Sequence, residues 1–186
     1  PAYITRSLSL ILGPAFAKEF GLKKLPADKE AEIAKYKTLA TPAALARADV
    51  SSGRKLYQTI CSACHVMYGE GGKIGPELTG SNRGDLNYLL LNILYPSDDI
   101  ADSYKMVTIA TKDGRTLAGN VSEEDKQKIV LNMIGQKNTI PKSDIKSRTV
   151  SDFSMMPAGL LQTLKNDEVV ALFKYMQTKQ QVPLSK

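Results

Sequence analysis

The chain has 186 residues and a mass of 20.3 kDa, which is enough for one domain with an added module. Its hydrophobic content of 42%, with 13 glycines and 9 prolines, is ordinary for a globular protein and excludes a disordered or collagen-like chain. The net charge of +6 is spread along the sequence without a basic cluster or a nucleic-acid-binding motif, so it favours an acidic protein partner over nucleic acid. The longest apolar stretch, residues 8–17, is too short for a transmembrane helix.

The first 48 residues predict helices and contain no motif with recognisable chemistry. Apolar residues at helical spacing predict helices over residues 5–12, 15–20 and 28–39, and we expect residues 1–48 to form an N-terminal helical extension or linker. The first residues imitate a secretory signal peptide, but a Gly-Pro break inside the apolar run and the helical spacing favour a helix. Because the first residue is Pro1, we expect a processed product or a fragment of a longer protein.

Both cysteines and the single histidine lie within five consecutive positions, Cys61-Ser62-Ala63-Cys64-His65. The pattern C-x-x-C-H is the attachment signature of c-type haem, in which each thiol adds to one vinyl group of the porphyrin and the histidine binds the iron. Two sulfurs about one helical turn apart match the fixed separation of the two vinyl groups. We therefore predict one haem c, bound covalently through Cys61 and Cys64, with His65 as an iron ligand.

Three other uses of the cysteine pair agree less well with the sequence. A thioredoxin-like redox pair follows a strand, whereas a helical pattern precedes Cys61. A zinc site needs four ligands, and since the chain has no further Cys or His, only carboxylates could complete it. A disulfide between Cys61 and Cys64 is sterically unfavourable on a helix.

The second axial ligand of the iron is expected to be a methionine, because a chain with one histidine cannot supply two imidazoles. The methionines are Met67, Met106, Met133, Met155, Met156 and Met176. The first is too close to His65 to cross the ring, and the next two and the last lie in strand-like or amphipathic helical segments, where methionine is usually a core residue. Met156 directly precedes Pro157, which fixes the chain direction and helps to hold the thioether toward the iron. We predict Met156 as the ligand, with Met155 as the alternative.

A glycine-rich loop follows the motif, from Gly69 to Gly80. It lacks the Lys-Ser/Thr ending of a phosphate-binding loop, and a loop that lies against a flat porphyrin also needs glycine. Within it, the carbonyl oxygen of Pro76 is predicted to accept the ring N–H of His65 and so to fix the orientation of the imidazole. Arg83 is a candidate partner for a haem propionate, with an ordinary surface arginine as the alternative.

The remaining pattern predicts helices around one β module. Helices are expected from residue 48 into the motif, over residues 86–94, and at the C-terminal end with Asn166 as N-cap, and the first and last of these should cross where Gly53 allows it. Strand-like alternation lies near residues 106–111, 116–121, 128–133, 138–140 and 148–150, with a Lys112-Asp113-Gly114-Arg115 hairpin turn between the first two. The expected fold is mainly α: a helical haem domain over residues 49–186, with a small antiparallel β module inserted at about residues 104–150, before the axial-methionine loop.

Several segments together carry a family resemblance. They are Gly53-Arg54-Lys55-Leu56-Tyr57, Cys61 to His65, Gly75-Pro76-Glu77-Leu78, Asn82-Arg83, Asn92-Ile93-Leu94-Tyr95-Pro96, Asp113-Gly114-Arg115 with Gly119, and Met155-Met156-Pro157-Ala158-Gly159-Leu160-Leu161. Over about residues 48–178 the chain resembles the cytochrome c type haem-binding domain of planctomycete and verrucomicrobial proteins. The resemblance implies a class I-like monohaem cytochrome c with Met156 as axial ligand and a β insertion before it. Members often look like the C-terminal domain of large secreted proteins that also carry a sugar-dehydrogenase-like β-propeller.

These observations favour an electron carrier over an enzyme. The haem would take single electrons from a dehydrogenase, fused or separate, and pass them to a respiratory acceptor such as a cytochrome or an oxidase. The alternative is a haem-based sensor, or a gas- or peroxide-binding domain, in which a labile methionine bond opens. A peroxidase is disfavoured because the single histidine leaves none for a distal pocket. Covalent haem attachment implies a periplasmic or other extracytoplasmic location.

Overall fold

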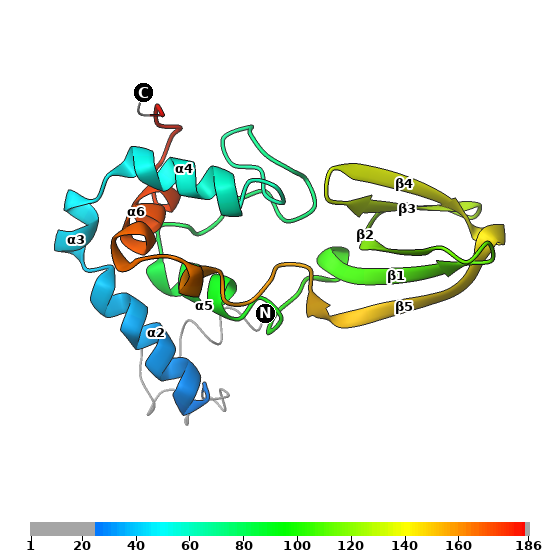
Figure 1. Ribbon diagram of the computed structural model, residues 1–186, viewed down its shortest axis with the longest axis horizontal. Helices are drawn as coiled ribbons and strands as arrows, with labels where there is room; N and C mark the ends of the chain where they lie inside the picture. Colours follow the sequence, from blue (N-terminus) through cyan, green and yellow to red (C-terminus); the bar gives the residue numbers. More distant parts are fainter. Residues whose placement is uncertain (1–24, 185–186) are drawn as a thin grey trace. The chain divides into compact units, whose positions relative to one another are not determined.

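The computed structural model describes residues 25–184 (Figure 1). The elements in chain order are α2 (Ala27–Leu39), α3 (Pro42–Arg47), α4 (Val50–Ile60), α5 (Leu86–Leu94), η1 (Asp102–Tyr104), β1 (Lys105–Thr111), β2 (Thr116–Glu124), β3 (Lys128–Met133), β4 (Gln136–Pro141), η2 (Lys142–Asp144), β5 (Ile145–Ser154), η3 (Leu160–Thr163) and α6 (Asn166–Met176). Helix accounts for 38% and strand for 25% of the structure. The prediction of a mainly α fold is therefore wrong, because the β module is a five-stranded antiparallel sheet and supplies a quarter of the structure.

The chain forms two compact units. The helical unit contains the residues up to Tyr57, the segment Asn82–Tyr95 and the residues from Ala158 onward. The sheet unit contains Gln58–Ser81 and Pro96–Pro157, so the C-x-x-C-H motif and both candidate methionine ligands belong to it. This division into units does not test the predicted boundary between an N-terminal extension, residues 1–48, and a haem domain, residues 49–186. That boundary stays a prediction.

In the helical unit, α4 crosses α6 at Gly53, as predicted. A Cβ atom at Gly53 would overlap the carbonyl oxygen of Ala171 and lie 2.9 Å from the Cβ atom of Tyr175, so only glycine permits this close approach. Next to the crossing, the rings of Tyr57 and Tyr175 pack with centroids 5.4 Å apart and planes tilted by 56°. The crossing therefore combines one missing side chain with one aromatic pair.

Helices α2 and α5 supply further core residues of this unit. The side chain of Asp85 accepts a 2.8 Å hydrogen bond from the backbone N–H of Asn87 and so caps α5, whose leucines supply much of the core. The side chains of α2 pack on the same core through Ile33 and Tyr36, which are both buried. The hydroxyl of Tyr95, just after α5, donates to the carboxylate of Glu32 in α2 at 2.6 Å, which links the two helices.

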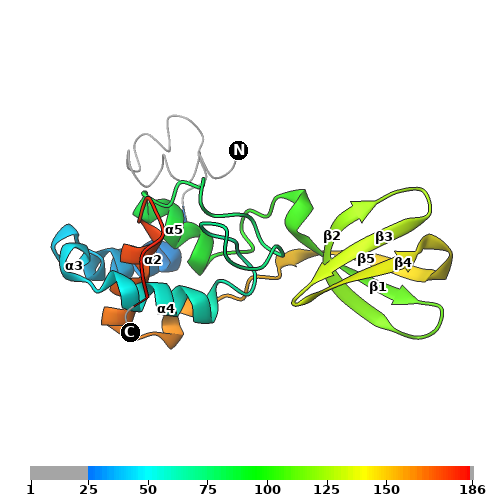
Figure 2. The same ribbon diagram turned by 90° about the horizontal axis from the view of Figure 1, so that it is seen from above.

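The sheet has the strand order β4-β3-β2-β1-β5, and all neighbouring strands are antiparallel. Because alternate residues of a strand share a face, β1, β3 and β4 place aliphatic side chains on one side of the strongly twisted sheet (Figure 2). These side chains form a separate core cluster of Val107, Ile109, Ile129, Leu131 and Ile140. The sheet therefore has a hydrophobic core of its own.

Strand β2 changes its partner in the middle. Its first half pairs with β1, up to Gly119 opposite Val107, and its second half pairs with β3 from Asn120 onward. A Cβ atom at Gly119 would lie 2.5 Å from the carbonyl oxygen of Asn132, so glycine allows the two strands to approach where the partner changes. A register shift between Val121 and Glu123 follows directly.

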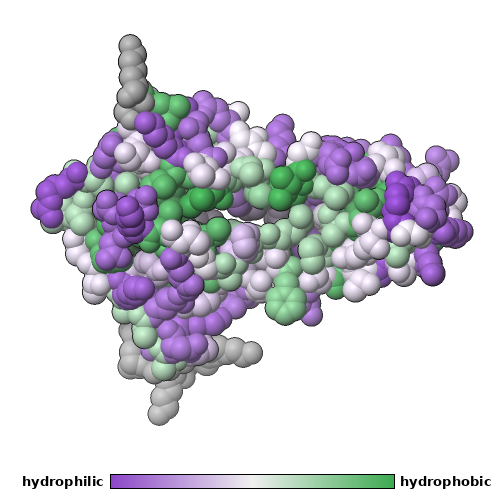
Figure 3. Space-filling model, in the orientation of Figure 1, coloured by the Kyte–Doolittle hydropathy of each residue, from purple (hydrophilic) through white to green (hydrophobic). Residues whose placement is uncertain are grey.

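The turns of the sheet differ in polarity at its two ends. The predicted hairpin turn after β1 is present: the backbone N–H of Thr111 donates to the carbonyl oxygen of Arg115 at 2.9 Å, and Gly114 has a φ of 91°. The surface over this turn and η2 is hydrophilic (Figures 1 and 3). By contrast, the β3–β4 turn exposes Ile134, and the edge strand β5 exposes Val150 and Phe153, the last with 72% of its surface accessible.

Most predicted elements are present, with differences at the helix ends. The predicted helices over residues 5–12 and 15–20 lie outside the described residues. The short helix α3 was not predicted, although Thr41 accepts a hydrogen bond from the N–H of Ala44 and Pro42 occupies the first turn. The N-cap of α6 is Lys165 rather than Asn166, and its backbone N–H donates to the carboxylate of Glu168 at 2.7 Å. Within residues 25–184, no helix is both long and apolar enough to cross a membrane.

Candidate haem site

The C-x-x-C-H motif forms a single tight turn at the end of α4. The backbone N–H groups of Cys64 and His65 both donate to the carbonyl oxygen of Cys61, at 3.1 and 3.0 Å. This turn keeps the two cysteines and the histidine on consecutive parts of one helical turn, and both thiols are free. Two free thiols and a histidine on one turn are the groups that covalent attachment of a c-type haem uses.

The surroundings of the motif favour the uncharged form of all three side chains. Burial, together with the neighbouring Cys64, raises the pKa of the Cys61 thiol to about 12, and burial also raises the pKa of Cys64. Burial lowers the pKa of His65, although its hydrogen bond to Pro76 acts in the opposite direction. A neutral imidazole is the form that can bind iron.

His65 is oriented by the carbonyl oxygen of Pro76, as the sequence predicts. Its Nδ1 atom lies 2.8 Å from that oxygen. A carbonyl oxygen can only accept, so Nδ1 must carry the proton and Nε2 must carry the lone pair. The hydrogen bond to Pro76 thereby selects the tautomer whose Nε2 can bind a metal.

The glycine-rich loop wraps the backbone of the motif itself. The N–H of Gly72 donates to the carbonyl oxygen of Ser62 at 2.7 Å, and a Cβ atom at Gly72 would overlap the carbonyl oxygen of Ala63. A Cβ atom at Gly75 would lie 2.5 Å from Cε1 of the His65 ring. These glycines are therefore needed for close contact with the motif and its imidazole, whereas the sequence suggested contact with the porphyrin alone.

Arg83 lies in the helical unit and is buried, so the surface-arginine alternative is wrong. Its guanidinium donates to the carbonyl oxygens of Met176 and, at 3.0 Å, Thr178, at the C-terminal end of α6. These carbonyls have no partner within the helix, and a cation is favourable beside them. The observed contacts give Arg83 a structural role, while a contact with a haem propionate stays a prediction.

The two candidate methionine ligands follow β5 directly. The N–H of Ser154, the last residue of that strand, donates to the hydroxyl of Ser97, and the hydroxyl of Ser154 accepts from the N–H of Met156, at 3.0 and 3.1 Å. Met155 and Met156 are both half-buried. The sheet thus fixes the starting point of the methionine loop.

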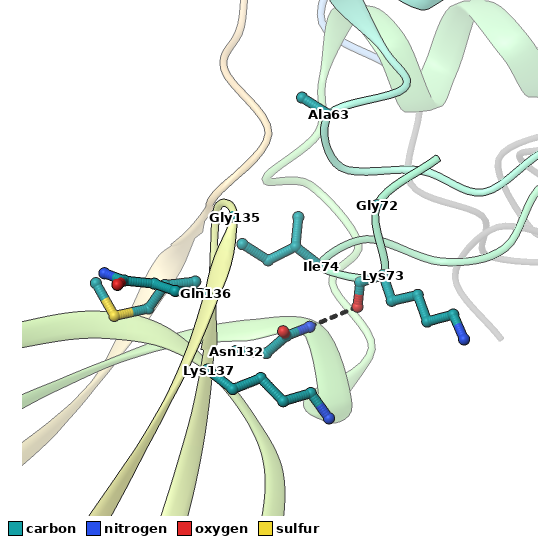
Figure 4. Close-up of a pocket in the computed structure, with 9 residues that line it drawn as sticks. Ala63, Gly72, Lys73, Ile74, Asn132, Gly135, Gln136 and Lys137 are labelled. Carbon is teal, nitrogen blue, oxygen red and sulfur yellow. Dashed lines mark hydrogen bonds between the residues drawn. The ribbon is translucent and has the colours of Figure 1, made fainter. Parts of the chain in front are cut away.

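Sequence reasoning missed two residues that reach the glycine-rich loop, Gly69 to Gly80, which is called the haem loop from here on. Asn120 in β2 and Asn132 in β3 donate to backbone carbonyls of that loop; Figure 4 shows the bond from Asn132 to Lys73. The only signal in the sequence is an asparagine inside each strand, a residue type depleted from strands. That signal does not say which partner the side chain binds.

The residues present fit a covalently attached haem. Two thiols lie on one turn, the imidazole presents Nε2 in the metal-binding tautomer, and a glycine takes the place of a side chain beside the ring. When bound, the haem supplies a reversible one-electron change at its iron. Cys61 and Cys64 would attach the haem, and His65, oriented by Pro76, is the residue that would hold its iron.

Comparison with known proteins agrees with this chemistry. No curated protein matches the chain. The family model described as cytochrome c matches residues 50–180, a range that includes the motif, the whole sheet and α6. The chain therefore belongs to the cytochrome c family, whose members carry covalently bound haem and transfer electrons.

Proposed function

We propose that the chain is a one-haem electron carrier whose iron is held by His65 and Met156. The observation that supports the proposal is the 2.8 Å contact between Nδ1 of His65 and the carbonyl oxygen of Pro76, which leaves the lone pair of the neutral imidazole on Nε2, the atom that would bind the metal. One motif and one histidine limit the chain to one haem with one imidazole ligand. Cys61 and Cys64 would attach the group and Pro76 would orient its histidine ligand, while the haem would supply the one-electron change.

The placement of the methionines supports Met156. Met67 and Met176 are buried packing residues, and Met106 and Met133 lie within strands, where the sulfur of Met133 accepts a hydrogen bond from Asn138 at 3.1 Å. Met155 and Met156 lie in the loop after β5 and are half-buried, in the same unit as His65, whereas Met67 of that unit is fully buried two residues from His65. Of these two, Met156 precedes Pro157 and has its backbone N–H tied to Ser154. A thioether ligand favours a reduction potential higher than a second imidazole would give.

The wider setting of the proposal rests on the resemblance to the planctomycete and verrucomicrobial haem-binding domains. There, the carrier would accept electrons from a dehydrogenase, fused or separate, and deliver them to a cytochrome or an oxidase. Covalent attachment of haem and the typical location of the family favour the periplasm. The excess of Lys and Arg over Asp and Glu suits an acidic redox partner.

The test is the absorption spectrum of the purified haem-loaded protein and of Met156→Ala, with Met155→Ala as the matched control. We expect the ferric wild type and Met155→Ala to show the weak charge-transfer band of a methionine–iron bond, and Met156→Ala to lack it. The ferrous wild type should not change on addition of CO, since both axial positions are filled. Ready CO binding by the wild type would instead favour a sensor with an open iron, and loss of the band in Met155→Ala alone would assign the ligand to Met155.

A further inference from the structure

Two asparagines on neighbouring strands donate hydrogen bonds to adjacent carbonyl groups of the haem loop. Asn120 in β2 and Asn132 in β3 are directly opposite each other in the β2–β3 register. The Nδ2 group of Asn132 donates to the carbonyl oxygen of Lys73 at 2.6 Å, and that of Asn120 donates to the carbonyl oxygen of Ile74 at 2.5 Å. The two donors are thus one cross-strand pair, and the two acceptors are consecutive peptide groups.

The residues that accept these two hydrogen bonds belong to the segment that contacts the proximal histidine. The N–H groups of Ile74 and Gly75 donate to the carbonyl oxygen of Cys64 at 3.1 and 2.8 Å, and Gly75 packs against the His65 ring. The next residue, Pro76, accepts the ring N–H. The segment from Lys73 to Pro76 therefore carries hydrogen bonds to the sheet at one end and to the imidazole at the other.

The burial of Asn120 indicates that its hydrogen bond to the haem loop is more than a surface contact. Asn120 is 5% exposed, and its Oδ1 atom is buried with no hydrogen-bond partner among the described residues. A buried polar atom without a partner is unfavourable, so an apolar residue here would relieve that cost at Oδ1. The bond from Nδ2 to Ile74 is the interaction that the amide gains in return.

We propose that Asn120 and Asn132 are positioning residues through which the sheet holds the carbonyl oxygen of Pro76 against His65 and thereby sets the basicity of the proximal ligand. The inference rests on the proposed function. A hydrogen bond at Nδ1 makes the imidazole a stronger donor to the metal, which favours the oxidised state. Releasing the segment from the sheet weakens that bond, so the reduction potential rises and the iron–histidine bond weakens.

The experiment uses the full-length haem-loaded protein with Asn120→Leu and Asn132→Leu, which keep the approximate side-chain size and remove the donor. Asn138→Leu is the matched control, because this asparagine lies in the same sheet but its Nδ2 donates to Met133. Asn132→Gln is the conservative variant that restores a donor, since a cavity of about 350 Å³ lined by Asn132, Gly135 and Lys73 leaves room for the longer side chain (Figure 4).

The readouts are the midpoint potential and the iron–histidine stretching frequency of the ferrous form made five-coordinate by Met156→Ala. We expect both leucine variants to raise the potential, with up to about a tenfold change in the reduced-to-oxidised ratio, ~59 mV for one electron. The stretching frequency should fall in both, stay unchanged in Asn138→Leu and recover in Asn132→Gln. A general loss of stability would move neither quantity in this pattern.

Unchanged potential and unchanged frequency in a folded, haem-loaded Asn132→Leu would overturn the proposal. This variant decides the matter even where Asn120→Leu does not fold, because Asn132 is only partly buried. Failure of the proposed function is seen separately, in the wild type itself, as CO binding or absence of the methionine–iron band. The proximal frequency would still report on the asparagine pair in that case.

Discussion

The helical unit and the sheet unit depend on opposite features of their cores. Where α4 meets α6, contact requires that Gly53 has no side chain, and any added atom overlaps the backbone of Ala171. The sheet instead depends on side chains that are present, among them Ile109 and Leu131, which are fully buried in its own core cluster. The helical crossing should thus be sensitive to added atoms, and the sheet to removed ones.

The largest effect is expected in the sheet unit, at the haem attachment. The double variant Cys61→Ala with Cys64→Ala should lose all covalently bound haem, because no thiol remains to add to the vinyl groups. Haem staining after denaturing electrophoresis and the intact mass measure this. Ser62→Ala, within the same turn, is the control and should keep its haem, since its hydroxyl only donates to the carbonyl oxygen of Gln58. A haem-linked mass in the double variant would contradict the assigned attachment.

Removing atoms from the sheet core tests the second half of the comparison. Leu131→Ala should lower the free energy of unfolding by about 2–5 kcal/mol, because it leaves a cavity among Val107, Ile109 and Ile140. Urea denaturation followed by circular dichroism gives this value. Val150→Ala on the exposed face of β5 should change it little. Equal losses in the two variants would mean that the cluster is not the core of the sheet.

Adding one methyl group to the helical crossing tests the first half. Gly53→Ala should destabilise the protein by about 1–3 kcal/mol, because the two helices must separate to admit the new Cβ atom. The same denaturation experiment measures it, with Gly84→Ala as control, since a Cβ atom there meets nothing within 4 Å. A Gly53→Ala protein as stable as the wild type would show that the helices do not cross at this residue.

The smallest expected effect is electrostatic and depends on pH. Hydrogen bonding to Lys142, followed by that to Arg148, lowers the pKa of the Glu124 carboxyl below its ordinary value of 4.5. A lowered folded-state pKa contributes stability that is present above the unfolded pKa and is lost as the pH falls through the folded pKa. Because the site is partly exposed, Glu124→Gln should cost about 0.2–1 kcal/mol at neutral pH and nothing in strong acid.

Urea midpoints at several pH values check the Glu124 prediction. Glu123→Gln is the matched control, because its neighbour Lys137 lies 3.9 Å away and the pair is more exposed. We expect the difference between wild type and Glu124→Gln to shrink on acidification, while Glu123→Gln remains close to the wild type throughout. A difference that stays constant with pH would assign the loss to packing instead of charge.

Local patterns in the sequence predict the positions of the helices and strands better than the proportions of helix and strand in the fold. Strand alternation with a Lys-Asp-Gly-Arg turn located all five strands, and the helix over Leu86–Leu94 has the predicted bounds. The prediction of a mainly α fold is wrong because the segment predicted to be a small insertion supplies a quarter of the structure as strand. Local pattern shows where a strand lies, but the size of the sheet depends on pairing between distant residues.

The site shows the same limit. The C-x-x-C-H motif and its hydrogen bond to Pro76 act over short sequence distances, so the sequence could predict them. Arg83 bonds to carbonyls 93 and 95 residues away, and Asn120 and Asn132 bond to carbonyls 46 and 59 residues away. A polar side chain in a sequence says that it needs a partner when buried, and only the fold says which one.

The polar hairpin turn between β1 and β2 gives the protein a practical point of attachment. It lies at the opposite end of the sheet from the β3–β4 turn, which lines the cavity beside the haem loop (Figures 1 and 4). Lys112 in this turn is exposed and can carry a label, whereas Gly114, with a φ of 91°, has to stay glycine. A tether or label placed there could fix the protein to an electrode or a fluorescent reporter while the hydrogen bonds that hold His65 stay untouched.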